Sequence, residues 1–373
     1  MSNADEHNEI LSRAARGVSP TALMFRRLRR NRVALIGFAL LVVLYLGAIF
    51  ADFLSPYHPH NQDLMNFYHP PTPVHFVDRG GTFHLRPFIY RYELTDLDSM
   101  TYQADTSARY PLRFFSKGYE YKLFWLIPTR IHLVTVDESA RFYLVGSDGL
   151  GRDIYSRLLH GSRISLSIGL IGIFISFTIA MIVGGVSGYF GGLIDDGIMR
   201  IIELIQSIPG LYLIFALRTS FPQDMSSAAA YRLMVIILGM IFWGSIARVI
   251  RSMTLSLREQ EYVMSARALG ASSLRVIIRH ILPNTFSYLI VAATISIPGY
   301  ILGEVALSFL GVGIQEPYAS WGNMLQQAQD IEVLTRFPWI LAPGFLIFIT
   351  VFAFNFFGDG LRDAFDPRHV EGA

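Results

Sequence analysis

Cysteine is absent from the 373-residue chain, and lysine occurs only at Lys117 and Lys122. Without cysteine the chain has no disulfide bonds, thiol nucleophiles, cysteine-based zinc sites or iron–sulfur clusters. A P-loop for ATP needs a lysine that follows a Gly-x-x-x-x-Gly pattern, and neither lysine does. Thiol chemistry and ATP binding through a P-loop are therefore excluded.

Charged residues are also scarce, at 16% of the chain, whereas soluble domains carry about a quarter. Hydrophobic residues make up 52%, and the mean hydropathy is +0.40. The formal net charge of +2 offers no electrostatic basis for binding nucleic acid. This composition predicts a membrane protein with no nucleic-acid partner.

Several long runs of the sequence are apolar enough to cross a membrane, which takes roughly 20 residues in a helix. The first run follows 32 residues and is longer than the apolar part of a signal peptide, so we expect a retained helix. We predict an all-α polytopic membrane protein, with its last five spans in a core at residues 164–358. Six transmembrane helices are expected at residues 33–54, 164–189, 197–217, 233–250, 288–309 and 339–357.

The arginines near the predicted spans indicate an orientation. Residues 1–32 contain seven arginines, and the loop 251–285 contains five. Cytoplasmic segments of membrane proteins carry an excess of basic residues. We therefore expect residues 1–32, the loop 251–285 and the tail 359–373 on the cytoplasmic side, and residues 55–163 on the opposite side.

The predicted outer segment, residues 55–163, contains strand-like sequence. Residues 74–77 and 82–85 flank Asp-Arg-Gly-Gly, which is typical of a hairpin with a glycine-rich turn. We expect a small β-rich domain within this segment. Further aromatic and β-branched runs lie at residues 119–125, 130–136 and 142–145.

Charged residues inside predicted spans are candidate functional residues, because they are costly in a membrane. Arg200 and Glu203 in the third span are three residues apart and can pair on one helix face. Glu304 in the fifth span lies one turn before Ser308 and six residues after Pro298. These residues either line or gate a path through the membrane or, for Glu304, hydrogen-bond at a helix interface, and both interpretations stay open.

Two motifs resemble catalytic or metal sites but have simpler interpretations. The sequence Gly-Val-Ser-Gly at residues 185–188 has the form of a membrane serine protease nucleophile, yet no histidine falls inside a predicted span to act as base. Five histidines between residues 58 and 84 match no compact zinc pattern. We expect no catalytic residue, cofactor or metal. Glycines four residues apart predict close helix packing instead, at Gly184, Gly188 and Gly192.

The predicted cytoplasmic loop contains two short helices. Residues 251–269 form an amphipathic stretch, Gly270 breaks it, Ser272 can cap a second helix, and Pro283 ends that helix at the membrane. Small side chains beside a glycine turn suit insertion into a groove of a partner; a helix lying on lipid headgroups is the weaker alternative. The side chains expected to be exposed are Tyr262, Val263, Ala266 and Leu269.

The sequence of this loop carries a family resemblance. Glu-Tyr-Val-Met-Ser-Ala-Arg-Ala-Leu-Gly at residues 261–270, followed by Arg-His-Ile-Leu-Pro-Asn at 279–284, resembles the coupling loop of ABC importer permeases of the dipeptide and oligopeptide branch. The spacing from Gly270 to Leu-Pro fits the general pattern. Met264, Ser265 and His280 depart from it.

Motifs elsewhere in the chain also resemble that branch, in particular its second, C-type permease subunit. They are Gly-Ser-Asp-Gly-Leu-Gly-Arg-Asp at 146–153, Leu-Ser-Phe-Leu-Gly at 307–311, Ser-Trp-Gly at 320–322 and Leu-Arg-Asp-Ala-Phe-Asp-Pro-Arg at 361–368. Residues 79–143 interrupt the family pattern as an insertion. We expect the insertion either to touch a binding protein or cap the outer mouth, or to be a stabilising addition without a transport role.

The resemblance implies six transmembrane helices of the type I ABC importer kind and a permease subunit that forms half of a peptide translocation path without being an enzyme. The implied partners are a second homologous permease, two ATP-hydrolysing subunits, an extracytoplasmic substrate-binding protein and membrane lipid. The implied location is a bacterial or archaeal plasma membrane. The residues implied to couple to the ATPases are Glu261, Tyr262, Ala266, Leu269, Gly270, Leu282 and Pro283.

Two alternatives remain for the transported substrate and mechanism. Importers of this kind with another cargo, such as nickel, a modified peptide or an oligosaccharide, would have the same sequence features. An ion-coupled secondary transporter would need buried ionisable groups in matched inverted halves, and the sequence has no such symmetry.

Overall fold

The computed structural model describes residues 20–97, 100–124, 126–222 and 225–365. Part of the predicted N-terminal segment, residues 1–19, and part of the predicted tail, residues 366–373, lie outside the described residues.

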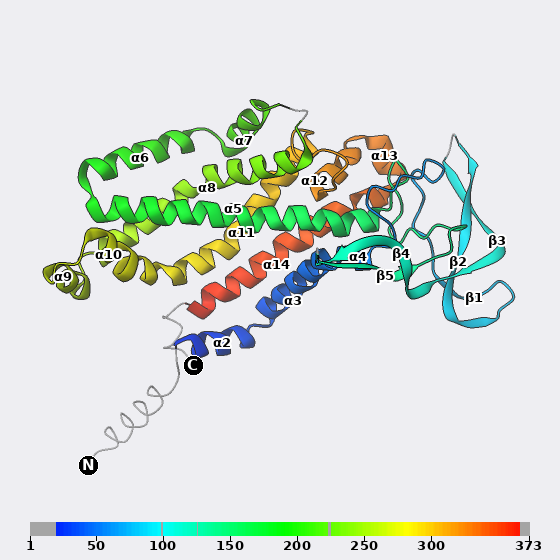
Figure 1. The fold of residues 1–373 in the computed structure, drawn as a ribbon, viewed down its shortest axis with the longest axis horizontal. Coiled ribbons are helices and arrows are strands. Elements are labelled where there is room, and N and C mark those ends of the chain that lie inside the picture. Colours follow the sequence, from blue (N-terminus) through cyan, green and yellow to red (C-terminus); the bar gives the residue numbers. More distant parts are fainter. Residues whose placement is uncertain (1–19, 98–99, 125, 223–224, 366–373) are drawn as a thin grey trace, which may run out of the picture.

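Helices dominate the structure and lie side by side (Figure 1). Within the described residues, five helical stretches are long and apolar enough to span a membrane. The side chain of Asn31 caps the first of them by accepting a hydrogen bond from the backbone nitrogen of Ala34 at 3.1 Å. The principal helices are α2 (Pro20–Arg30), α3 (Arg32–Ile49), α4 (Ala51–Leu54), α5 (Ile154–Phe190), α8 (Ser227–Leu257), α11 (Phe286–Phe309) and α14 (Ala342–Phe365).

The third predicted span, residues 197–217, is wrong as a single helix. It is divided into α6 (Gly192–Ser207) and α7 (Gly210–Thr219), which meet at 85°. Pro209 lacks a backbone N–H, and its ring disfavours the helical conformation at Ile208, whose ψ is 126°. The described chain therefore has five candidate spans, or six if this bent pair crosses as one.

The predicted loop 251–285 also differs in detail. α8 continues to Leu257, so residues 251–269 are not one helix, and α9 (Glu261–Ala268) is separate. Pro283 does not end the second helix. α10 (Ser273–Val276) passes through a π-helical turn at Ile277–Ile281 and a 3₁₀ turn at Leu282–Thr285 into α11. These changes of helix type accommodate Pro283, which has no backbone N–H to donate to a regular α-helix.

Strands lie at one end of the helices, which we call the strand end; α9 lies at the opposite end, the α9 end (Figure 1). One antiparallel sheet has the order β1-β2-β3, and β4 pairs with β5 in another. Residues 142–145, which we expected to be a strand, are not one; the backbone nitrogen of Tyr143 is bonded to Thr72 Oγ1 at 3.1 Å. The strands are β1 (His75–Val77), β2 (Phe83–Asp96), β3 (Thr101–Pro111), β4 (Arg113–Leu123) and β5 (Ile127–Thr135).

α5 and α8 pack closely because two glycines face α8. A Cβ added at Gly184 would lie 2.6 Å from the carbonyl oxygen of Ala247, and one at Gly188 would lie 2.6 Å from that of Arg251. Gly192 lies beyond α5 and has no atom within 4 Å of such a position, so its predicted packing role is wrong.

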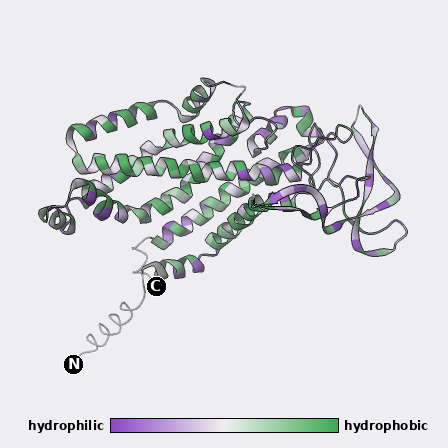
Figure 2. Ribbon diagram, in the orientation of Figure 1, coloured by the Kyte–Doolittle hydropathy of each residue, from purple (hydrophilic) through white to green (hydrophobic). Residues whose placement is uncertain are grey.

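Hydropathy follows the same arrangement. Figure 2 shows the long helices mostly hydrophobic, with hydrophilic residues concentrated at the strand end and near α9. The main core, which includes the buried Leu166, Leu238 and Ile301, lies among α5, α8 and α11. Two short helices, α12 (Trp321–Met324) and α13 (Ile331–Arg336), cover the strand end of this core.

Candidate functional site

The turn after α9 needs glycine at position 270. The backbone nitrogen of Ala271 donates to the carbonyl of Ala266 at 3.1 Å, and that of Gly270 donates to Arg267 at 2.9 Å. This pair of bonds is a Schellman motif, which ends a helix with a residue of positive φ. Gly270 has φ +80°. The predicted break at Gly270 is therefore a defined turn between α9 and α10.

A small core of its own stabilises this turn. Val263, Val276 and Ile281 are buried against Tyr189 at the end of α5. Val263 was expected to be exposed, and this is wrong, since it is fully buried. It lies on the face of α9 that packs toward α10 and α5, which leaves the opposite face open.

Several exposed side chains of the α9 turn are apolar. Leu269 is 88% exposed and Tyr262 is 44% exposed, and Met264 and Leu274 are also exposed. Exposed apolar side chains on a projecting turn are candidates for contact with protein or lipid. We call these four residues the α9 surface.

The remaining predicted loop residues differ in their exposure. Glu261 and Pro283 are exposed, and Ala266 is half-buried. No atom lies within 4 Å of a Cβ built at Gly270. Leu282 is half-buried against α5, where it would touch a side chain added at Gly185.

Ionic contacts bind the base of the loop to the long helices. Arg251 of α8 pairs with Asp195 of α6, which also accepts a hydrogen bond from Ser187 of α5. Arg258, between α8 and α9, donates to the carbonyls of Gly188 at 3.0 Å and Tyr189 at 3.3 Å. These contacts connect the loop to α5, α6 and α8.

Sequence reasoning missed Asp195 and Arg258. The available signal was an acidic residue in the first turn of α6, where a carboxylate is favoured by the helix dipole. The arginine partner of Asp195 is Arg251, which is 56 positions away, and no local pattern identifies this partner.

Arg200 and Glu203 form the pair that their spacing predicted. Their side chains are 2.9 Å apart, and both are exposed on α6. Exposed pairs of this type contribute little to stability.

Glu304 lies in a buried hydrogen-bond cluster between helices. It accepts from Ser165 of α5 at 3.0 Å and from Ser308 of α11 at 2.6 Å. Ser165 also accepts from the backbone nitrogen of Trp321 at 3.2 Å, and Ser308 from that of Ile314 at 3.0 Å. Because Glu304 is fully buried, this geometry favours interhelical hydrogen bonding over contact with an aqueous path.

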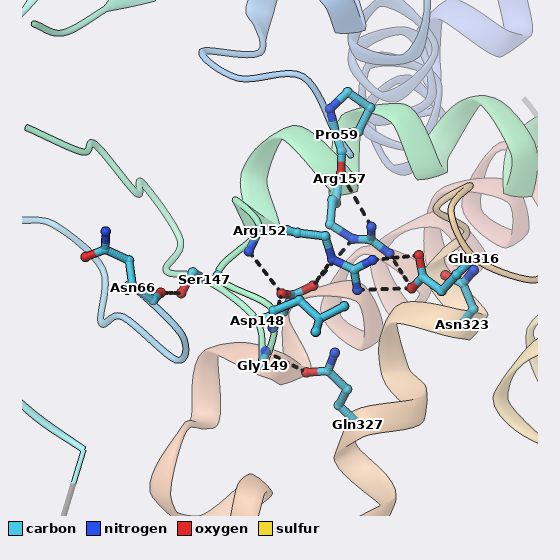
Figure 3. Close-up of polar contacts among 12 residues, drawn as sticks. Pro59, Asn66, Ser147, Asp148, Gly149, Arg152, Arg157, Glu316, Asn323 and Gln327 are labelled. Carbon is cyan, nitrogen blue, oxygen red and sulfur yellow. Dashed lines mark hydrogen bonds and ion pairs between the residues drawn. The ribbon is translucent and has the colours of Figure 1, made fainter. Parts of the chain in front are cut away.

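A second charged cluster lies at the strand end (Figure 3). Arg152 is bidentate to Glu316 at 2.6 and 3.0 Å, and Arg157 contacts the same carboxylate at 2.9 Å. Arg152 also donates to Asp148 at 2.7 Å. The side chains of Arg152 and Arg157 are 4% and 1% exposed, while that of Glu316 is 48% exposed. We call these four residues the strand-end network.

The network joins the start of α5 to the segment after α11. Burial alone raises the pKa of Glu316, but the charges and hydrogen bonds of Arg157 and Arg152 outweigh it and hold that pKa below its usual value. The side chain of Gln327, in the segment after α11, also accepts a hydrogen bond from the backbone nitrogen of Gly149, just before α5, at 3.2 Å. The network therefore favours the ionised form of Glu316 and connects two distant parts of the chain.

Sequence reasoning recognised residues 146–153 as a family motif but gave them no role. The i, i+4 spacing of Asp148 and Arg152 was an available signal for a local ion pair. Glu316 lies 159 positions from Arg157, so it could not be assigned from spacing.

The chain matches known families and proteins over most of its length. Residues 151–370 match the binding-protein-dependent transport system inner membrane component, and residues 19–71 match the N-terminal TM domain of oligopeptide transport permease C. The oligopeptide transport system permease protein OppC of Haemophilus influenzae is 43% identical over 61% of this chain and 71% of its own length. The dipeptide transport system permease protein DppC of Bacillus subtilis is 30% identical over 98% of this chain and 91% of its own length.

The first family match includes the α9 turn, the Glu304 cluster and three residues of the strand-end network, Arg152, Arg157 and Glu316. The first family covers more than half of the chain, and the Bacillus relative is aligned with nearly all of it. The resemblance seen in the sequence is thereby confirmed, and the chain belongs to the family of binding-protein-dependent transport system inner membrane components.

Proposed function

We propose that this chain is a permease subunit of an ATP-driven importer of dipeptides or oligopeptides. The α9 turn carries the proposal, because exposed apolar side chains lie on a loop that continues from α8 and whose base is bonded to α5 and α6. The OppC and DppC relatives, which are peptide transport permeases by name, support peptides as the cargo.

The importer requires partners that this chain does not replace. One of the two ATPase subunits docks at the α9 surface, a second homologous permease binds the other and completes the translocation path, and an extracytoplasmic binding protein delivers the substrate. When the ATPases close, they displace α9, and Arg258 and Arg251 transmit the displacement to α5, α6 and α8. Rigid-body motion of packed helices of this kind can alternate access to a path.

The proposal predicts that the chain purified alone hydrolyses no ATP, since it has no P-loop lysine. In proteoliposomes with the second permease, the ATPases and the binding protein, ATP should drive uptake of a radiolabelled dipeptide. ATP turnover by the chain alone that a substitution in this chain reduces would contradict the proposal. Uptake of nickel or an oligosaccharide instead of peptide would retain the importer but reject its cargo.

The orientation that supports this function places the α9 end in the cytoplasm. The strand end, with the insertion at residues 79–143, then lies outside. Because the chain has no cysteine, single cysteines report orientation without background. In intact cells that express the permeases without the ATPase subunits, a membrane-impermeant maleimide should label Leu85→Cys and should label Leu269→Cys only after the membrane is opened. Both side chains are nearly fully exposed, at 89% and 88%. The opposite labelling pattern would therefore show that the chain has the reverse orientation.

A further inference from the structure

The hairpin of β4 and β5 extends from the strand end back toward the first span (Figure 1). The ring of Phe124 lies 5.5 Å from that of Phe50, at the end of α3. Farther up the hairpin, Tyr119 donates through its hydroxyl to the carbonyl of Asp52 at 3.3 Å. These contacts fix the end of the hairpin beside the strand end of α3.

The end of this hairpin exposes apolar side chains. Phe124, Leu126 and Ile127 are 45%, 82% and 58% exposed. On α3, Val43 and Ile49 are likewise exposed, at 66% and 43%. Because α3 is a candidate membrane span, its exposed apolar residues are a surface that can face acyl chains, and the contact of Phe124 with Phe50 places the end of the hairpin beside that surface.

A groove beneath the hairpin connects the two surfaces. It has a volume of about 1040 Å³ and is lined by Leu123 of β4, by Val43 and Phe50, and by Phe345 of α14, among other mainly apolar residues. Apolar walls of this kind suit an acyl chain better than a polar ligand. Lys122 is exposed directly before Leu123, and lysine beside an apolar segment favours the phosphate layer of a bilayer.

We propose that the end of the β4–β5 hairpin is a membrane anchor that lies in the outer interface of the bilayer, with Phe124, Leu126 and Ile127 among acyl chains and Lys122 at lipid phosphates. The anchor does not reach the centre of the bilayer. The two strands form a separate two-stranded sheet, and their outer backbone groups could not be satisfied in hydrocarbon. This inference requires that the chain span a membrane but is independent of the cargo.

Fluorescence quenching at single cysteines tests the anchor, again because the chain has no cysteine of its own. Leu126→Cys, labelled with an environment-sensitive fluorophore, is placed in the complete transporter with cysteine-free partners in lipid nanodiscs. Ile49→Cys on α3 is the lipid reference, and Leu85→Cys on β2 is the aqueous reference. Spin-labelled phospholipid quenches probes in the bilayer, and iodide quenches probes in water.

We expect the probe at residue 126 to be quenched by spin-labelled lipid to the extent seen at residue 49, and to be protected from iodide relative to residue 85. Ile127→Cys should behave in the same way, which guards against a local fault in one variant. Iodide quenching equal to that at residue 85 would overturn the anchor. Protection from both quenchers would also overturn it, since the hairpin would then contact another subunit.

Discussion

Substitution of Ala266 or Gly270 by arginine is expected to abolish ATP-driven peptide uptake while the protein still inserts into the membrane. Both residues lie at the turn beside the α9 surface, where Ala266 is half-buried and a Cβ built at Gly270 would meet no atom within 4 Å. A long cation at either position cannot enter a groove that accepts small residues. The measurement is dipeptide uptake in proteoliposomes, together with the amount of ATPase that co-purifies with the variant.

Two control variants separate docking from folding of the loop. Gly270→Ala adds only a methyl group, so it should cost about 1 kcal/mol for the positive φ and retain most uptake. Arg275→Ala, on an exposed side chain of the same loop, should leave uptake unchanged. Normal uptake and normal ATPase binding by Ala266→Arg and Gly270→Arg would show that the α9 surface does not couple the subunits.

Glu316→Gln is expected to destabilise the strand end, because it leaves two buried guanidinium groups with Asp148 as their only carboxylate in the strand-end network. Breaking a fully buried ion pair costs about 3 to 5 kcal/mol. Since Glu316 is half-exposed and water can enter, we expect about 2 kcal/mol. The midpoint of thermal unfolding of the solubilised protein should fall, and the segment after α11 should become sensitive to protease.

The matched control is Glu332→Gln in the same segment. Glu332 also pairs with an arginine, Arg336 at 3.1 Å, but its side chain is 75% exposed, so its loss should change stability by less than about 0.5 kcal/mol. Equal effects of the two substitutions would mean that burial of the strand-end network has no special consequence.

The effect of Glu316→Gln should depend on pH in one direction. The pKa of Glu316 lies below its ordinary value of 4.5, so its ionised form stabilises the folded state above that value, and this contribution is lost as the pH falls through the lowered pKa. The difference between wild type and variant should therefore be full at pH 7 and vanish in strong acid. A difference that grows on acidification would contradict the assigned charge state.

The sequence identified most of the long helices and the loop between α8 and α11. Apolar run lengths and glycine positions are local properties, and they act on the nearest turns of the backbone. The same local rules were insufficient for Val263. It lies in a short helix whose buried face is chosen by α10 and Tyr189, so its burial depends on how the loop folds against α5.

Prolines show why local rules fail inside the apolar stretches. The chain bends by 85° at Pro209, yet α11 continues through Pro298. Pro298 and its neighbour Ile297 are buried in that helix, and Ile297 approaches Gly169 of α5. Packing against α5 thus supports a continuous helix at one proline, and the sequence alone does not distinguish the two positions.

By itself the sequence determined that this protein is a polytopic membrane permease of the ABC importer kind, where most of its apolar helices lie, and that its loop turns at Gly270. Only the tertiary structure decided that Arg157 meets Glu316, that Asp195 meets Arg251, and that Glu304 is enclosed by serines. The physical reason is the distance along the sequence over which each interaction acts. Hydrophobic periodicity and backbone conformation act over a few residues, whereas an ion pair forms between whichever charges the packed helices bring within contact distance.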